Sequence, residues 1–155
     1  MNEQAFIERV QEMERMLYRV SRSILPNWEE CADAVQEALT KAWAKKETVQ
    51  PSYFSPWLTR IVINECHTIY RKGKRTVLVE RIEERQVEAP DETLRLAIQA
   101  LPEKLRLPLI LYHLEGFSID EVAKMMHIPA GTVKTRLFKA RKQLRTELTE
   151  GQYGI

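Results

Sequence analysis

The sequence has few of the residues that secreted, membrane-spanning or metal-binding proteins require. Its 155 residues include only five glycines, two cysteines and three histidines. The two cysteines, Cys31 and Cys66, offer no disulfide framework and indicate a reducing compartment. No run of 18 apolar residues occurs, so we expect no membrane span. The first ten residues contain acids and lack the apolar core of a secretory signal, so we expect a cytoplasmic protein.

The sequence also lacks the usual spacings of catalytic and metal sites. Its cysteines and histidines follow neither C-x-x-C nor H-x-x-x-H spacing. The one adjacent pair, Cys66 and His67, is interpreted as a buried structural cysteine beside a surface histidine. There is no Ser/His/Asp arrangement and no glycine-rich phosphate loop. We therefore expect no enzyme, no catalytic residue, no metal and no cofactor.

The scarcity of glycine and of strand alternation predicts an all-α protein. Helices are expected over residues 3–25, 29–46, 56–71, 91–101 and 102–114 and in a helical hairpin at 117–145, with a frayed tail after Leu148. The segment 76–79 is the one strand-like exception. Charge divides the chain into three parts. Residues 1–75 have 12 basic and 10 acidic side chains, residues 76–92 have 2 basic and 6 acidic, and residues 93–155 have 10 basic and 6 acidic. We predict two small helical domains, 1–75 and 93–155, joined by a flexible acidic linker, 76–92.

The hairpin at 117–145 is the most informative segment. Apolar residues at helical spacing would seat both of its helices on a core: Val122, Ala123, Met126 and Ile128 in the first, and Val133, Leu137, Ala140 and Leu144 in the second. Residues 132–145 carry six Lys or Arg and no acid. His127 is a misfit at the turn position where glycine is favoured for its positive φ, although histidine tolerates that conformation better than most residues. The pattern predicts a helix-turn-helix whose second helix reads the major groove of DNA.

A charged helix face can also be only a solvated surface, and the pattern of charge leaves that alternative open. Phe138 favours the DNA-binding interpretation. It lies among the basic residues, away from the apolar stripe, where an aromatic ring can pack on a thymine methyl group or a sugar.

Two expected helices of the N-terminal domain also carry polar faces. Within 29–46, the polar face would contain Asp33, Gln36, Glu37, Thr40 and Lys41. This face is either an ordinary solvent-exposed surface or a docking surface for a partner. Within 56–71 and just beyond it, a polar stripe of Arg60, Asn64, His67, Arg71 and Lys74 ends in a basic cluster that suits a phosphate backbone. We interpret Trp28, Trp43 and Trp57 as packing residues rather than as stacking platforms. Trp57 lies next to the loop before residue 56 and could be either.

Taken together, three segments resemble the bacterial RNA polymerase sigma factors of the extracytoplasmic-function group. CADAVQEALTKAW resembles the family's polymerase-docking helix, and FSPWLTRIVINECHTIYRKGKR resembles the helix that reads and melts the promoter's upstream edge. LPEKLRLPLILYHLEGFSIDEVAKMMHIPAGTVKTRLFKARKQL resembles the domain that reads the distal promoter element. The resemblance implies a sigma factor that directs core RNA polymerase to promoters and assists their opening.

The resemblance assigns a role to each polar face. Docking on core polymerase would involve Asp33, Gln36, Glu37 and Lys41. Reading of the −10 element would involve Trp57, Arg60, Asn64, His67, Arg71 and Lys74, with the loop 49–53 around a flipped base. Reading of the −35 element, with its phosphates, would involve Thr132, Lys134, Thr135, Arg136, Phe138, Lys139, Arg141 and Lys142. The expected partners are core RNA polymerase, promoter DNA and an anti-sigma protein, which in this family is usually membrane-anchored.

The sequence departs from the family pattern at two places. The loop 49–52 lacks the Phe-Arg-Gly motif common in the family, and Lys134 and Lys139 stand where many members have arginine, which would change or soften base preference. A stand-alone helix-turn-helix regulator is the alternative hypothesis. It gives no reason for the polar face at 33–41, and the sequence has no apolar stripe for a dimer.

Overall fold

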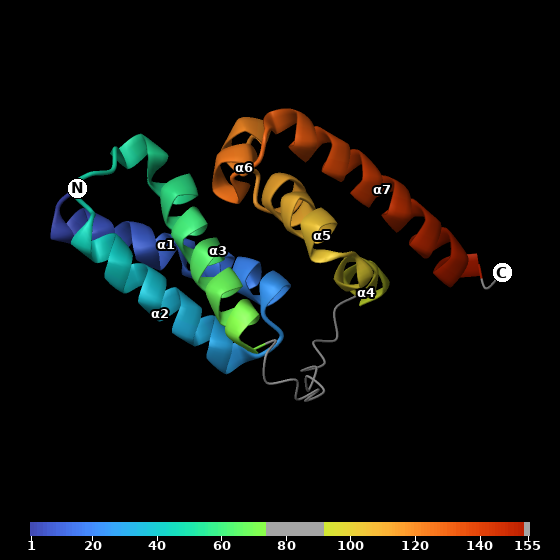
Figure 1. Cartoon of the computed structure of the whole chain (residues 1–155), viewed down its shortest axis with the longest axis horizontal. Helices are drawn as coiled ribbons and strands as arrows, with labels where there is room; N and C mark the ends of the chain where they lie inside the picture. Colours follow the sequence, from blue (N-terminus) through green and yellow to red (C-terminus); the bar gives the residue numbers. More distant parts are fainter. Residues whose placement is uncertain (74–91, 154–155) are drawn as a thin grey trace.

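The computed structural model describes residues 1–73 and 92–153, and every regular element in them is helical (Figure 1). The N-terminal half, residues 1–73, contains α1 (Glu3–Ile24), α2 (Trp28–Ala44), a short 3₁₀ turn η1 (Pro51–Tyr53) and α3 (Phe54–Gly73). The C-terminal half, residues 92–153, contains α4 (Glu92–Ala100), α5 (Glu103–Leu109), the π turn η3 (Ile110–Leu114), α6 (Ile119–Met126) and α7 (Ala130–Tyr153). The all-α prediction is confirmed.

Polar side chains fix where several helices begin. The Asn2 side chain accepts a hydrogen bond from the backbone N–H of Ala5, and the Asn27 side chain accepts one from that of Glu29. Such caps satisfy donors that a helix start leaves without partners. Helix α7 extends to Tyr153, beyond the point where the sequence predicted fraying.

The predicted helix 102–114 is confirmed in extent, but its second half, Ile110–Leu114, is a π-helical turn rather than regular α-helix. Pro108 lies inside α5 and has no N–H to continue the hydrogen-bond ladder. The ladder then widens: the N–H of Glu115 bonds to the carbonyl of Ile110, five residues earlier. Gly116, with φ of 78°, ends this turn in the left-handed conformation that glycine adopts without strain.

One apolar cluster extends through both halves of the chain. It contains Leu17 and Leu58 from the N-terminal half together with Leu111, Val122 and Leu137 from the C-terminal half, all fully buried. Helix α3 packs against α6, and α1 packs against α5. The two predicted domains are therefore in direct contact, and α2 and α7 lie on opposite outer sides of the molecule (Figure 1).

Several sequence predictions lie outside the described residues. They are the strand-like segment 76–79, nearly all of the acidic linker 76–92, and Lys74. Within the described parts of the chain, no helix has the combined length and apolar character needed to cross a membrane.

Candidate nucleic-acid interface

Helices α6 and α7 and the turn between them form the predicted helix-turn-helix. Ser118 and Glu121 begin α6 with a reciprocal capping box, in which each side chain accepts a hydrogen bond from the other residue's backbone N–H. His127 ends α6 with φ of 58° and ψ of 47°. The left-handed conformation predicted for His127 is confirmed, and the backbone N–H of Ile128 closes the turn onto the carbonyl of Ala123 at 3.0 Å.

Helix α7 divides into a buried face and a basic exposed face. Val133, Leu137 and Ala140 are completely buried, as the spacing predicted. In α6, the sequence pattern placed Met126 in the core, but the structure buries Met125 instead and leaves Met126 only partly buried. The predicted DNA-reading residues of α7 all reach the surface: Thr132 and Arg136 partly, and Lys134, Thr135, Phe138, Lys139, Arg141 and Lys142 fully.

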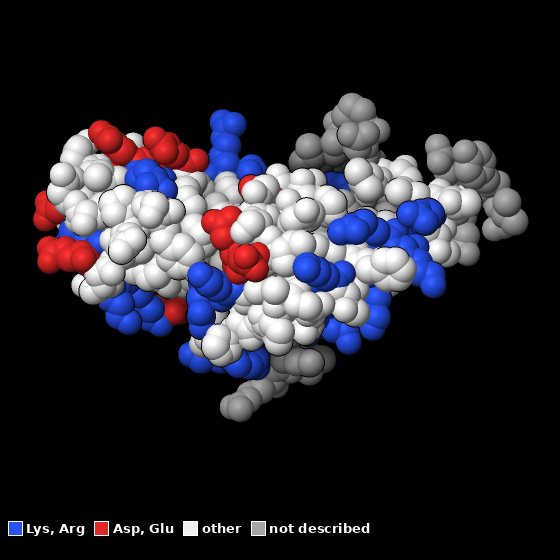
Figure 2. Space-filling view, turned by 90° about the horizontal axis from the view of Figure 1, so that it is seen from above, with Lys and Arg blue, Asp and Glu red and all other residues white. Residues whose placement is uncertain are grey.

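Phe138 is the most exposed large apolar side chain among the described residues, at 65%. Figure 2 shows several Lys and Arg side chains over the half of the molecule that holds the C-terminal helices. An exposed aromatic ring within a basic helix face has no packing role inside the protein. It is available for a nucleic acid that supplies phosphates and apolar groups together.

A histidine that the sequence did not single out contacts this basic face. The Nε atom of Arg141 donates a hydrogen bond to Nε2 of His113, which lies on η3, at 3.1 Å. Partial burial and the nearby Arg141 charge lower the pKa of His113 from its ordinary 6.5. The neutral imidazole can therefore accept the arginine N–H near neutral pH. Periodicity gave no signal for this contact, because it joins residues 28 positions apart.

The predicted polymerase-docking face of α2 is a continuous exposed surface. Asp33, Gln36, Glu37 and Lys41 are all exposed, while Ala34, Val35, Ala38 and Ala42 are buried on the opposite side of the helix. Lys41 forms an ion pair with Glu65 of α3, and the hydrogen bond to Glu65 raises the pKa of Lys41. The pair holds one end of the exposed face against the neighbouring helix.

The loop before α3 is held in place by Arg9, a residue that sequence reasoning missed. Its guanidinium donates to the carbonyl of Pro51 at 3.1 Å and to the hydroxyl of Ser55 at 3.2 Å, and it lies over the ring of Phe54. Trp57 packs partly buried against Phe54, with ring centroids 5.8 Å apart. The packing predicted for Trp57 is therefore confirmed, at the base of the loop.

The polar stripe of α3 is only partly exposed. Asn64 and Arg71 reach solvent. Arg60 and His67 instead contact the C-terminal half: Arg60 donates to the carbonyl of Lys124 at 3.2 Å, and Nε2 of His67 lies 2.7 Å from Oε1 of Glu103. The sequence placed both residues on an open outer face, and this part of the prediction is wrong because α5 and α6 pack there.

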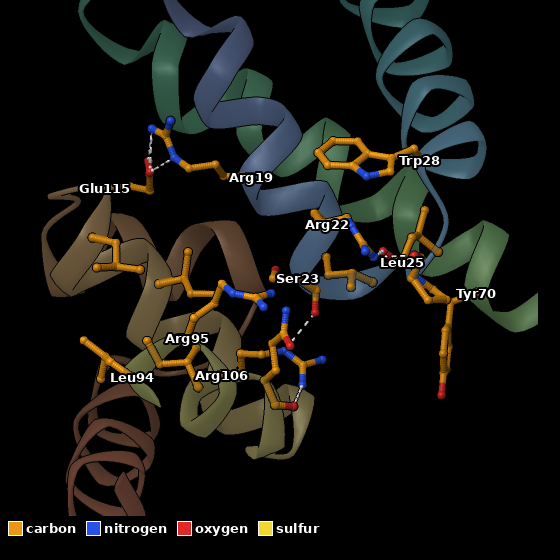
Figure 3. Close-up of a pocket in the computed structure, with 16 residues that line it drawn as sticks. Arg19, Arg22, Ser23, Leu25, Trp28, Tyr70, Leu94, Arg95, Arg106 and Glu115 are labelled. Carbon is orange, nitrogen blue, oxygen red and sulfur yellow. Dashed lines mark hydrogen bonds and ion pairs between the residues drawn. The ribbon is translucent and has the colours of Figure 1, made fainter. Parts of the chain in front are cut away.

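A groove of about 690 Å³ lies on the other side of this junction, between the end of α1, the start of α2 and helices α4 and α5 (Figure 3). Arginines and exposed apolar side chains line it, among them Arg19, Arg22, Trp28, Leu94 and Leu114. Trp28 is 44% exposed under the guanidinium of Arg22, so the prediction that it is a packing residue is only partly right. Trp43 stacks edge-on against Phe6 but is also partly open to solvent.

The burial predicted for Cys66 is confirmed, and Cys31 is buried as well. Both are completely buried, and burial raises the pKa of the Cys31 thiol to about 11 and that of Cys66 to about 12. Across residues 1–73 and 92–153, no group of His, Cys, Asp and Glu side chains is arranged to hold a metal ion.

Comparison with protein families gives two matches that follow the two halves. Residues 9–76 match Sigma-70 region 2, and residues 91–144 match Sigma-70 region 4. The first match includes the exposed face of α2 and the whole of α3. The second includes the helix-turn-helix.

Individual relatives agree with these matches. The chain is 31% identical to the RNA polymerase sigma factor SigV of Bacillus subtilis over 140 residues. This alignment covers 86% of this chain and 84% of SigV. It is 29% identical to the ECF RNA polymerase sigma-E factor of Haemophilus influenzae, over 96% of each chain. Its structure resembles that of the sigma factor RpoE of Bartonella quintana, solved in complex with the anti-sigma factor NepR, with a TM-score of 0.81, 26% identity and coverage of 93% of this chain and 96% of RpoE.

Proposed function

This chain belongs to the extracytoplasmic-function (ECF) group of RNA polymerase sigma factors and directs RNA polymerase in transcription initiation, and we propose a division of that task among its surfaces. The exposed face of α2 docks on core polymerase. The loop 49–53 and α3 read the −10 element, and α7 reads the −35 element. The N-terminal residues 1–75 and C-terminal residues 93–155 thus act as separate reading units.

The observation that carries this proposal is the basic, aromatic-bearing surface of α7. Its Lys and Arg side chains can neutralise phosphates, and its short polar side chains and Phe138 can contact base edges. Lysines at 134 and 139 bind guanine without the two-pronged geometry of arginine, so we infer a softer base preference at the positions that they contact.

The exposed face of α2 distinguishes this proposal from a stand-alone regulator. Asp33, Gln36 and Glu37 are exposed on α2, and α2 lies on the outer side of the molecule opposite α7 (Figure 1). A regulator that binds DNA without polymerase would have no use for two functional surfaces so far apart on its fold. A polymerase subunit needs both at once, one for the enzyme and one for the DNA.

In the −10 unit, we infer that the loop 49–53 forms one wall of a pocket for an unstacked base. Arg9 holds this loop through a hydrogen bond to the carbonyl of Pro51 and ties it to the start of α3 through a second one to Ser55, so the pocket is partly preorganised. Extruding a base from the DNA stack costs a few kcal/mol. A loop that is ordered before binding loses less conformational entropy on binding than a flexible loop, so it adds less to the total free-energy cost. Trp57 lies at its base, and Asn64 and Arg71 extend the surface along α3.

We further propose that the chain has no catalytic chemistry of its own and acts in the cytoplasm, where core polymerase and DNA are located. Its family consists of initiation factors, which supply promoter recognition to an enzyme made of other subunits. An anti-sigma protein, membrane-anchored in the usual arrangement of the family, is the proposed inhibitor. The groove lined by Trp28, Leu94 and Leu114 is an apolar surface rimmed by arginines that suits an acidic amphipathic helix.

The test is reconstitution with core RNA polymerase. We expect the mixture to produce specific run-off transcripts from some fragments of genomic DNA, and sequencing those transcripts would define the promoter motif. A chain that forms no stable complex with core polymerase at low salt, yet binds specific duplex DNA by itself, would reject this function in favour of a stand-alone regulator.

A further inference from the structure

We propose that the groove between α1, α2, α4 and α5 is a binding site for a fatty acid, an unbranched alkyl chain that ends in a carboxylate (Figure 3). The inference rests on the proposed function, because that function assigns the same groove to an acidic helix of an inhibitor. It adds a small molecule with the same combination of an apolar body and a negative charge. The acid and the helix would exclude each other from the groove.

The groove has the size and the floor of a small-molecule site. Its volume of about 690 Å³ lies within the range of roughly 300–1,000 Å³ that is typical of ligand pockets. Aliphatic side chains from both halves line it: Ile24 and Leu25 at the end of α1, Ile98 on α4 and Ile110 on η3. Such a lining offers no hydrogen bonds, so it favours an alkyl chain over a polar ligand.

Three further apolar side chains in the lining are exposed. Trp28 of α2 is 44% exposed, Leu94 of α4 39% and Leu114 of η3 60%. A single exposed apolar side chain is normal on a protein surface, but these three border one groove whose floor is already apolar. An alkyl chain between them would remove apolar area of both ligand and protein from water.

The groove also has an excess of positive charge. Four arginines line it, but only one carboxylate does, that of Glu115. Both oxygens of this carboxylate accept hydrogen bonds from Arg19, at 2.8 and 3.0 Å, and its side chain is only 4% exposed. The charge of Glu115 is therefore already used by one arginine, and the other three remain to attract an anion.

Arg106 is the first of these cations. It donates to the carbonyls of Ser23, Gln99 and Leu101 at 2.9, 3.1 and 2.7 Å, and it forms no ion pair with a carboxylate that the structure describes. Burial lowers the pKa of Arg106 from its ordinary value, and the charge of Glu103 offsets this only in part. Neutral carbonyls thus leave its charge incompletely compensated.

Arg22 is in the same situation on the other side of the groove floor. It donates to the carbonyls of Leu25 and Pro26, and its guanidinium lies over the ring of Trp28, 5.3 Å from the centroid. It too has no ion pair with a carboxylate in the described parts of the chain. A ligand carboxylate would give Arg22 and Arg106 charge-assisted hydrogen bonds, which are stronger than bonds to neutral carbonyls.

Calorimetric titration of the full chain with octanoate, decanoate and dodecanoate, each below its micelle concentration, tests the site. We expect one acid per chain and an affinity that rises by up to about fourfold for each added CH₂ group. Methyl decanoate keeps the chain but has no charge, so it should bind about tenfold more weakly than decanoate. Decyltrimethylammonium, with the opposite charge, should not bind.

A pair of arginine variants tests the position of the carboxylate. Arg22→Gln should weaken decanoate binding about tenfold and leave methyl decanoate nearly unchanged, because only the charged head contacts Arg22. Arg15→Gln is the matched control, since Arg15 is an exposed arginine of the same helix that does not line the groove. It should change neither ligand.

A pair of leucine variants tests the position of the alkyl chain. Leu94→Ser should weaken both decanoate and methyl decanoate. Leu96→Ser, on the same helix and 45% exposed but outside the groove lining, should change neither. Phe138→Ser tests the other place where an exposed apolar side chain lies among cations, the basic face of α7, and should also have no effect.

Three outcomes would overturn the inference: no saturable binding of any of the three acids, equal binding of decanoate and decyltrimethylammonium, or losses that follow the control positions rather than Arg22 and Leu94. Failure of the proposed function is a different result, in which the chain and core polymerase yield no specific transcript whether or not an acid binds. Specific transcripts from a chain that binds no acid would reject only the fatty-acid site.

Discussion

The guanidinium of Arg141 on α7 and the imidazole of His113 on η3 form a hydrogen bond of 3.1 Å across two elements of the C-terminal half. The Nε–H of Arg141 is the donor in this bond, and the arginine side chain is exposed to solvent. His113 thereby positions an arginine of the proposed −35 surface without itself belonging to it.

This relationship predicts a pH dependence of −35 binding. The pKa of His113 is lowered, by burial first and by Arg141 second, so the neutral acceptor is stable in the folded chain above the ordinary value of 6.5. As pH falls from 6.5 through the lowered pKa, protonation removes the acceptor and places a second cation beside Arg141, so both the contact and its contribution to stability are lost.

We expect the affinity of the holoenzyme for duplex −35 DNA to fall over this range. His113→Ala should weaken binding by about 1 kcal/mol at neutral pH and flatten the pH profile. Parallel profiles for the two proteins would contradict this role.

Phe138→Ala should weaken −35 recognition by about 1–3 kcal/mol, because base contacts of this kind typically contribute that amount. Lys134→Ala should act similarly and also reduce the salt dependence of binding. Both side chains are exposed, so the free energy of unfolding should stay within about 0.5 kcal/mol of the original. Binding titrations on the promoter and on a scrambled −35 duplex provide the measurement.

Glu147→Ala, an exposed position further along α7, is the control for these two variants. Equal losses on the promoter and on the scrambled duplex would mean that Phe138 and Lys134 contact only the backbone.

Gln36→Ala combined with Glu37→Ala should impair binding to core polymerase while leaving the fold intact, since both side chains are exposed on α2. A matched control exists in α1, where Gln11 and Glu12 form another exposed Gln–Glu pair. Affinity for core, measured by fluorescence anisotropy, should drop at least about tenfold for the α2 variant if it removes two central contacts. Unaltered affinity in the α2 variant would refute the docking assignment.

Leu111→Ala should destabilise the chain by about 2–5 kcal/mol, because a fully buried leucine leaves a cavity in the cluster shared by both halves. Leu114→Ala, in the same π turn but 60% exposed, should cost less than about 0.5 kcal/mol. Urea denaturation followed by circular dichroism measures both. Similar midpoints for the two variants would show that the shared cluster contributes little.

The native thiols should be unreactive until the chain unfolds. Burial raises the pKa of Cys31 to about 11 and that of Cys66 to about 12, so little thiolate exists near pH 8 and little of either sulfur is accessible. A thiol-reactive dye should label both cysteines in urea and neither in buffer. Rapid labelling of the folded chain would contradict their buried, structural role.

Local patterns were sufficient for much of the fold. Apolar spacing predicted the buried residues Val133, Leu137 and Ala140, and the position of His127 predicted a left-handed turn. These features depend on residues within one or two helical turns, which the sequence displays directly. The π turn at Ile110–Leu114 was not predictable in this way, because Pro108 signals only that the regular ladder is weakened there.

The sequence by itself therefore determined the helices, the helix-turn-helix and the chemical character of each face. Only the tertiary structure decided which faces are available: Arg60 and His67 have the same spacing as the exposed Asn64 and Arg71, yet they contact α6 and α5. The physical reason is that helical periodicity fixes the direction of a side chain relative to its own helix axis. What lies in that direction depends on packing between segments that are distant in the chain, here through the apolar cluster shared by the two halves.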